Sequence, residues 1–291
     1  MSFADRSERM GLDVIGNGSY FYEDSLSKIR YDKLCTKEDP EIEVPVYAIF
    51  TGKPEPYEGR MTYVGVVSDE YEFEGNEIIN DRIRQSILEF GSPVFREVTF
   101  LNPSLTYMRK EMVIQNSRVI HRTVGEIYPE IIISNTYNGH GAKNIQFGIS
   151  MVHRDRTLSF GFKEKILSMR QVHIQSARST VTSIGNYVES FSSGISDLIH
   201  TNMNNELSSM DIMRTLDLIE KIGKKRRDLI SVELEAARAE GSIITTWNMF
   251  LSILKYSTME TNINAKSLLE NVAERVLVLP GSMLTRLVEA A

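Results

Sequence analysis

The spacing of the apolar residues changes along this chain, and the change limits the folds that the chain can adopt. Between residues 44 and 152 most apolar residues lie in short runs of β-branched and aromatic side chains, separated by turn residues. Such runs are typical of strands, because these side chains pack well on a pleated surface. We expect strands at residues 44–50, 61–67, 94–100, 105–114, 126–134 and 144–152.

One segment within this region has the spacing of a helix. In residues 76–91, apolar side chains recur at i, i+4, i+8 and i+11, at Ile79, Ile83, Ile87 and Phe90. Asn76 is a residue type that caps helix starts, and Gly91 is one that ends helices. The segment therefore predicts a helix that packs against the sheet.

The chain beyond residue 187 is helical in pattern. We expect inward-facing residues at Ile212, Leu216, Ile219, Ile222, Ile243, Trp247, Phe250, Leu251, Leu254, Leu268, Val272 and Val276. Residues 1–43 show no sustained period and predict an irregular arm. The sequence therefore predicts an α+β protein, with a mainly antiparallel sheet and a packed helix in residues 44–187 and a helical region in residues 188–291.

Composition and cysteine usage limit the compartment. Cys35 is the single cysteine, so the chain has no internal disulfide and no multi-cysteine zinc site. No apolar run of signal-peptide length follows Met1, and no stretch approaches the roughly 18 apolar residues that cross a bilayer. We expect a cytoplasmic protein with no membrane partner.

The net charge of −6 is unevenly distributed. Residues 1–90 carry 10 Lys and Arg against 19 Asp and Glu, whereas residues 91–187 carry 12 against 6. A basic region raises the local potential and favours phosphates or acidic proteins as partners. Neutralisation of the acidic and basic segments by each other after folding is the alternative.

A polar stretch in the basic region, "ISNTYNGHGAKNIQFGISMVHRDR" at residues 133–156, allows several interpretations. Asn138-Gly139 predicts a hairpin turn, and the same glycines with Lys143 would suit an anion cradle. These two interpretations are compatible. The histidines lack the close spacing of a metal site, and no nucleophile elbow or phosphate-binding loop is present, so we predict no catalytic residue, metal or cofactor.

Basic residues recur along the consecutive predicted strands, with aromatic residues between them. Neighbouring strands can bring cations into a band that contacts phosphates, beside aromatic rings that stack on bases. A core position is the alternative for each aromatic residue. The candidate contacts to nucleic acid are Arg109, Arg118, Arg122, Lys143, Arg154, Arg156, Tyr137 and Phe147. The run "KKRRD" at 224–228, which the acidic "ELEAARAE" follows closely, predicts a solvated helix end, and phosphate contact is the alternative.

Four ordered blocks suggest a family. "YVGVVSDEYEFEGNE", "YPEIIISNTYNGHGAKNIQFGISMV", "RQVHIQSAR" and "GSIITTWNMFLSILKYST" span much of residues 61–285. Together they resemble the phage/plasmid-like protein family, catalogued as domain of unknown function 932. The resemblance implies a protein of phages, prophages or plasmids, with a suspected role in DNA handling such as single-strand binding or annealing.

Two hypotheses on function follow from the residues and the resemblance. The first is a mobile-element protein that binds single-stranded nucleic acid, works as a homo-oligomer and assists annealing or recombination. The second is a phage protein that binds and inhibits a host protein or defence complex through its acidic N-terminal and helical C-terminal parts. An enzyme is a third possibility without a local motif to support it.

Overall fold

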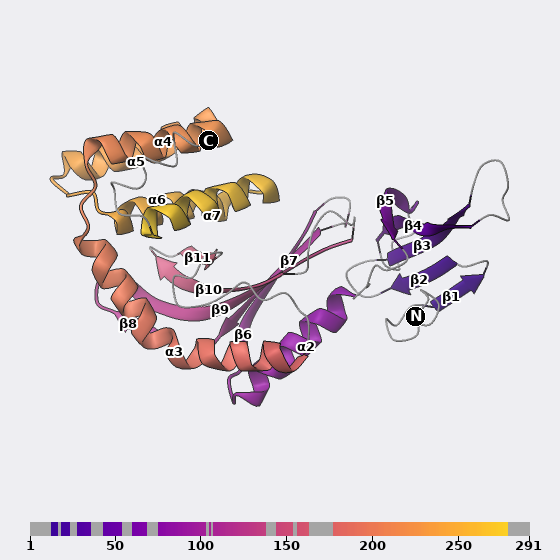
Figure 1. The fold of residues 1–291 in the computed structure, drawn as a ribbon. Coiled ribbons are helices and arrows are strands. Elements are labelled where there is room, and N and C mark those ends of the chain that lie inside the picture. Colours follow the sequence, from indigo (N-terminus) through magenta and orange to yellow (C-terminus); the bar gives the residue numbers. More distant parts are fainter. Residues whose placement is uncertain are drawn as a thin grey trace. The chain divides into compact units, whose positions relative to one another are not determined.

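The computed structural model describes residues 13–16, 19–23, 28–35, 43–53, 60–68, 75–102, 105, 107–137, 144–153, 156–162 and 177–278. These residues form two antiparallel sheets and a set of helices (Figure 1). The predicted α+β class, with a helical C-terminal region, is therefore confirmed.

The chain divides into two compact units, each assembled from segments that are distant in sequence. The first unit contains Met1–Met112, Ile132–Ile145 and Val172–Ser183, and the second contains Val113–Ile131, Gln146–Gln171 and Ile184–Ala291. Strands β7 (Tyr107–Ile114), β9 (Gly125–Thr136) and β10 (Asn144–His153) contribute residues to both.

The first sheet is a five-stranded antiparallel meander in the first unit, with the order β1-β2-β3-β4-β5. Its strands are β1 (Asp13–Gly16), β2 (Ser19–Glu23), β3 (Lys28–Cys35), β4 (Glu43–Gly52) and β5 (Thr62–Ser68). The last two confirm predicted strands. The first three lie in residues 1–43, so the prediction of an irregular arm was wrong there; their short alternating runs are interrupted too often to show a period in the sequence.

The second sheet has six strands in the order β11-β10-β9-β7-β6, and β8 pairs with β9. The strands not yet defined are β6 (Val94–Leu101), β8 (Val119–His121) and β11 (Arg156–Gly161). The predicted strands in this region are confirmed, and β9 and β10 are neighbours as the hairpin prediction requires. The turn itself, residues 138–143, lies outside the described residues.

Helix α2 (Asn76–Glu89) confirms the predicted helix, with Ile79, Ile83 and Ile87 buried. Two details of the prediction were wrong. Gly75 is the N-cap in place of Asn76, and Phe90 is 39% exposed because the helix ends before it. Gly91 has φ of 64°, which fits the predicted stop because glycine adopts positive φ without steric cost.

The second unit is helical beyond β11. Its helices are α3 (Ala177–Asn204), which belongs to this unit from Ile184 onward, α4 (Ser209–Ile222), α5 (Lys224–Ala239), α6 (Thr246–Met259) and α7 (Ile263–Val278). Helix α3 begins ten residues before the predicted change at 187. Ser208 caps α4 and Thr245 caps α6 through a capping box, where side-chain oxygens accept backbone N–H groups that have no partner within the helix.

Most predicted inward-facing residues of these helices are buried, Ile222 and Leu251 are half-buried, and two aliphatic ones are exposed. Ile243, before α6, is 61% exposed, and Leu268 on α7 is 50% exposed. The aromatic core of the unit joins α6 to β11, because Phe250 packs edge to face on Phe160 with ring centroids 5.1 Å apart. None of the helices in the described part of the chain is long and apolar enough to span a membrane.

Candidate nucleic-acid interface

Three of the residues predicted to contact nucleic acid are buried. Arg109 is 5% exposed, and its Nε atom lies 2.9 Å from Oε1 of Glu111. Tyr137 and Phe147 are 2% and 4% exposed, and the Phe147 ring packs on the ring of Tyr187. The prediction was wrong at these positions. Strands β7 and β10, which carry Arg109 and Phe147, bury consecutive residues and so cover both faces of the sheet, and Tyr137, which follows β9, packs in the core beneath the five-stranded sheet.

Three other predicted contacts are exposed cations in the second unit. Arg118 directly precedes β8, Arg122 directly follows β8, and Arg156 begins β11. Nη1 of Arg118 lies 3.4 Å from Oε1 of Glu126, a surface ion pair that offsets part of its charge. The remaining two predicted contacts lie outside the described residues: Lys143 and Arg154.

A row of side chains that the sequence did not indicate crosses one face of the five-stranded sheet. Arg30 of β3, Phe50 of β4 and Tyr63 of β5 are successive partners in the strand register. The guanidinium carbon of Arg30 lies 4.8 Å from the centroid of the Phe50 ring. The Phe50 and Tyr63 rings meet edge to face with centroids 5.8 Å apart. We call these three residues the aromatic row.

The aromatic row is accessible because a β-bulge in β5 redirects Tyr63. Phe50 pairs with Tyr63 while Ile49 pairs with Gly65, so the register shifts at Val64. Val64 packs on the buried side of the sheet, and Tyr63 is left 56% exposed. A bulge adds one residue to a strand and thereby changes which face the following side chains occupy.

The opposite face of the same sheet is closed by an apolar core. The core includes Tyr137, which arrives from the end of β9 and packs against residues of β3, β4 and β5. This core holds the backbone beneath the aromatic row in place, because well-packed interiors leave little room for strand movement. Its members are Ile29, Tyr31, Tyr47, Ile49, Val67 and Tyr137.

Cations lie within the aromatic row and at one end of the strands that carry it. Arg30 forms an ion pair with Asp32 at 3.0 Å, and its side chain remains 37% exposed. Lys53 directly follows β4, Arg60 precedes β5, and both are exposed. Because Thr51 pairs with Thr62, these two cations lie at the same end of the β4–β5 pair.

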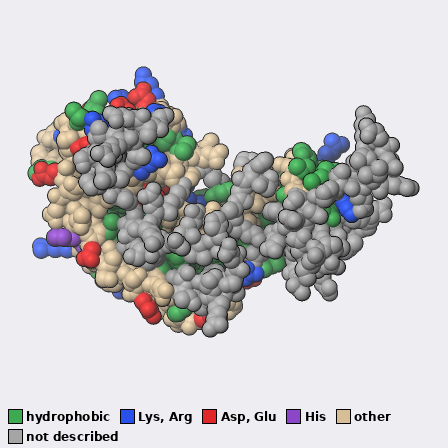
Figure 2. Space-filling view, in the orientation of Figure 1, with side chains coloured by type: hydrophobic (Ala, Val, Ile, Leu, Met, Phe, Trp, Pro, Cys, Tyr) green, Lys and Arg blue, Asp and Glu red, His purple; other side chains and the backbone are tan. Residues whose placement is uncertain are grey.

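Exposed aromatic rings beside cations can bind a single-stranded nucleic acid. Bases stack on aromatic side chains whatever their sequence, and Arg or Lys contacts the phosphates. Sheets that present aromatic residues on an open face are used in this way for unpaired RNA. Figure 2 shows hydrophobic side chains at the surface over β5, with Lys or Arg side chains beside them.

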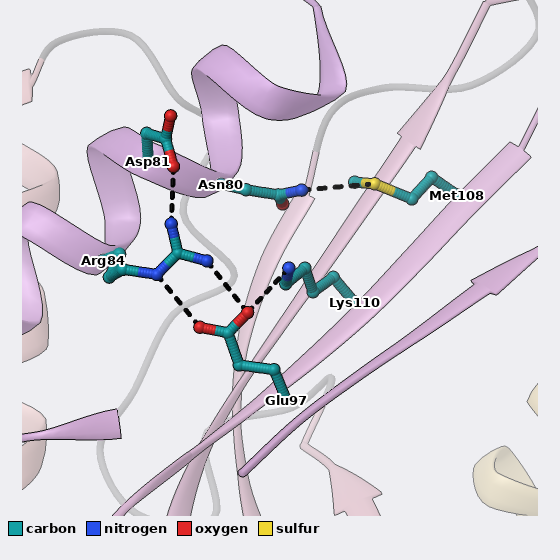
Figure 3. Close-up of polar contacts among 6 residues, drawn as sticks. All are labelled: Asn80, Asp81, Arg84, Glu97, Met108 and Lys110. Atoms are coloured by element: carbon teal, nitrogen blue, oxygen red, sulfur yellow. Dashed lines mark hydrogen bonds and ion pairs between the residues drawn. The ribbon is translucent and has the colours of Figure 1, made fainter. Parts of the chain in front are cut away.

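A second polar cluster in the first unit joins α2 to β6 and β7 (Figure 3). Arg84 donates two hydrogen bonds to Glu97, at 3.0 and 2.9 Å, and one to Asp81. Lys110 Nζ lies 2.7 Å from Oε2 of the same Glu97. Burial acts to raise the pKa of Glu97, but the hydrogen bonds from Arg84 and Lys110 outweigh it, so the pKa lies below its ordinary value. Each charge is matched within the cluster, which therefore anchors the helix.

Two polar side chains in the second unit, Glu130 and Tyr187, are fully buried. Glu130 is 0% exposed and accepts a hydrogen bond from the Ser159 hydroxyl. Tyr187, also buried, donates to the carbonyl oxygen of Gly148, and burial raises the pKa of Tyr187 well above its ordinary value. The Tyr187 hydrogen bond stabilises the contact between α3 and β10, the Ser159 hydrogen bond joins β11 to Glu130 of β9, and the burial of both groups argues against a role in binding.

One described histidine has a clear local role. Nδ1 of His121 accepts hydrogen bonds from the backbone N–H groups of Thr123 and Val124, both at 3.3 Å. His121 therefore orders the turn between β8 and β9. His140 and His173 lie outside the described residues.

The comparisons with known proteins add no relative. No protein family, no curated protein and no solved structure matches the chain.

Proposed function

We propose that this protein binds single-stranded nucleic acid on the open face of the five-stranded sheet, with bases stacked on Tyr63 and Phe50 and phosphates near Arg30. The observation that supports the proposal most directly is the exposure of Tyr63. The Tyr63 ring is 56% exposed and meets the edge of the Phe50 ring, and the guanidinium group of Arg30 lies over Phe50, so Tyr63 leaves an aromatic surface for a base. Lys53 and Arg60 supply further charge at the end of the face.

The test is the fluorescence anisotropy of labelled single-stranded and double-stranded oligonucleotides, titrated with the protein at several salt concentrations. The proposal expects salt-sensitive binding that prefers single strands. It also expects Tyr63→Ala to weaken binding by about 1–3 kcal/mol, the usual contribution of one stacked base.

Phe95→Ala is the matched control for this variant. Phe95, on β6, is 49% exposed, similar to Tyr63, but does not belong to the aromatic row. Equal loss of binding in both variants, or no binding by the wild type at low salt, contradicts the proposal. The double variant Arg118→Glu/Arg122→Glu tests whether the exposed cations around β8 add phosphate contacts.

The wider role that we propose is that of a mobile-element protein in annealing or recombination. This role is what the four sequence blocks within residues 61–285 imply through their likeness to phage/plasmid-like proteins, taken together with the single strand proposed as the ligand. Stacking and phosphate contact require no cofactor and no covalent step. Strand annealing of complementary oligonucleotides, measured by fluorescence quenching with and without the protein, tests this role.

A second candidate function is the binding of a host protein. Its support is the exposure of Met210 and Met213 on α4, at 61% and 51%, because methionine-rich surfaces adapt to protein partners. A complex of defined stoichiometry with one host protein, lost in Met213→Glu, together with no affinity for nucleic acid, favours this function over the first.

A further inference from the structure

Helix α5 has two apolar faces, and only one of them is covered. Ile230 and Leu234 form the covered face and are buried. On either side of them, polar side chains of α5 contact α4 and α6. Nη2 of Arg238 lies 3.4 Å from the Ser209 hydroxyl of α4, and Nζ of Lys255 on α6 lies 2.9 Å from Oε2 of Glu233. The exposed apolar face therefore differs from the two sides of α5 that contact α4 and α6.

The exposed face carries an apolar stripe with a regular spacing. Leu229 is 43% exposed and Val232 is 65% exposed, and Ala236 and Ala239 are exposed as well. Their separations of three, four and three residues match the alternating three and four of a coiled-coil seam. Ile243 is also 61% exposed, but it lies beyond the end of α5 and after Gly241, whose φ is 79°, so it is not part of the stripe. Figure 2 shows hydrophobic side chains at the surface in the region of α4 and α5.

We propose that this stripe is the contact between two copies of the chain, with the two α5 helices packed antiparallel. The sizes of the side chains support this arrangement. An antiparallel pair centred on the stripe places Val232 opposite Ala236 of the second copy and Leu229 opposite Ala239 of the second copy. Large side chains then meet small ones, which allows close packing, whereas a parallel pair places Val232 against itself and alanine against alanine.

The charges along α5 also complement those of an antiparallel copy. Near its start α5 carries exposed Lys224, Lys225 and Asp228, and near its end it carries exposed Glu235 and Arg238, with exposed Glu240 directly after it, so the exposed charges are net basic at the start and net acidic at the end. In the antiparallel pair the basic end of each helix lies beside the acidic end of the other. A parallel pair instead places like charges together, which disfavours it. The inference does not depend on the proposed binding of nucleic acid.

The test is sedimentation equilibrium of the full chain over a range of concentrations, without nucleic acid. We expect a dimer whose dissociation constant rises at least ~10-fold in Val232→Glu, as for a residue near the centre of an interface. Leu268→Glu is the matched control, because Leu268 is 50% exposed on α7 and lies outside the stripe. Circular dichroism verifies that both variants fold.

The direction of the helices is tested by exchanging charges. Lys225→Glu is expected to weaken the dimer, and Lys225→Glu/Glu240→Lys is expected to restore it, because the exchanged charges again face each other in the antiparallel pair. A monomeric wild type, or a dimer that Val232→Glu leaves intact, overturns the proposal. Failure of the double variant to restore the dimer overturns the antiparallel arrangement.

Discussion

The hydroxyl oxygen of Tyr137 accepts a hydrogen bond from the backbone N–H of Asn76 at 2.8 Å, although the two residues are 61 positions apart. The N–H groups in the first turn of a helix have no partner within the helix. Tyr137 supplies that partner, and its ring belongs to the core beneath the aromatic row. One side chain thus links the start of α2 to the sheet that carries the candidate interface.

Tyr137→Phe is expected to destabilise the protein by about 1–3 kcal/mol, because it keeps the ring and leaves a buried N–H without its acceptor. Asn76 is 1% exposed, so water does not replace the lost oxygen easily. Urea unfolding followed by circular dichroism measures the change. Tyr63→Phe is the control: Tyr63 is more than half exposed, and removal of its hydroxyl is expected to leave the free energy of unfolding within about 0.5 kcal/mol.

Tyr63→Ala and Arg30→Gln are expected to weaken binding of single-stranded oligonucleotides in different ways. Stacking releases no counterion, so Tyr63→Ala lowers the affinity and leaves the slope of log K against log salt unchanged. Loss of a phosphate contact at Arg30 reduces that slope by about 0.7 for a single strand. Anisotropy titrations at four salt concentrations separate the two effects, and identical slopes in Arg30→Gln and wild type would remove Arg30 from the phosphate contacts.

The strands and helices with an uninterrupted period could be predicted from the sequence. Residues 76–91 and the segments that became α4, α6 and α7 were recognised because their apolar residues follow one face of a helix. The strands in residues 13–35 were missed because β1 and β2 are short and because charged residues interrupt the apolar alternation of β3. Their stability comes from pairing with neighbouring strands, which a local period does not reveal.

The candidate interface could not be predicted for a related reason. Simple alternation along β5 assigns Tyr63 to the same face as Val67, which is 6% exposed and belongs to the core. The bulge at Val64 reverses that assignment, and it is set by the pairing with β4. Arg30 lies where an irregular arm was expected. In contrast, the cations of the central region were visible in the sequence, but their burial or exposure depends on tertiary packing.

Glu97→Gln is expected to lower the free energy of unfolding at neutral pH by up to about 1 kcal/mol, because Arg84 and Lys110 both lose a charged partner at a solvent-exposed site. The pKa of Glu97 in the folded protein lies below its ordinary value of 4.5. Its contribution is therefore fully present above pH 4.5 and is lost as the pH falls through the lower folded pKa. Urea unfolding between pH 3 and pH 7 should show the difference between wild type and variant shrinking only at the acidic end.

Arg84→Gln provides the second half of this test. If the pair acts as a unit, the double variant Arg84→Gln/Glu97→Gln loses less stability than the sum of the two single variants. Additive losses would show that Arg84 and Glu97 contribute independently, and the anchoring of α2 would then have to come from its buried isoleucines.

Gly148→Ala is expected to destabilise the second unit by about 3 kcal/mol or more, because overpacking against backbone atoms cannot relax by a rotamer change. A Cβ at this position would lie 2.2 Å from the carbonyl oxygen of Phe160 on β11. Gly52→Ala is the matched control in a strand, since its nearest neighbour is a side-chain atom of Met61 at 3.4 Å. Thermal unfolding of both variants compares them, and equal melting temperatures would mean that β10 and β11 are further apart at Gly148 than the structure places them.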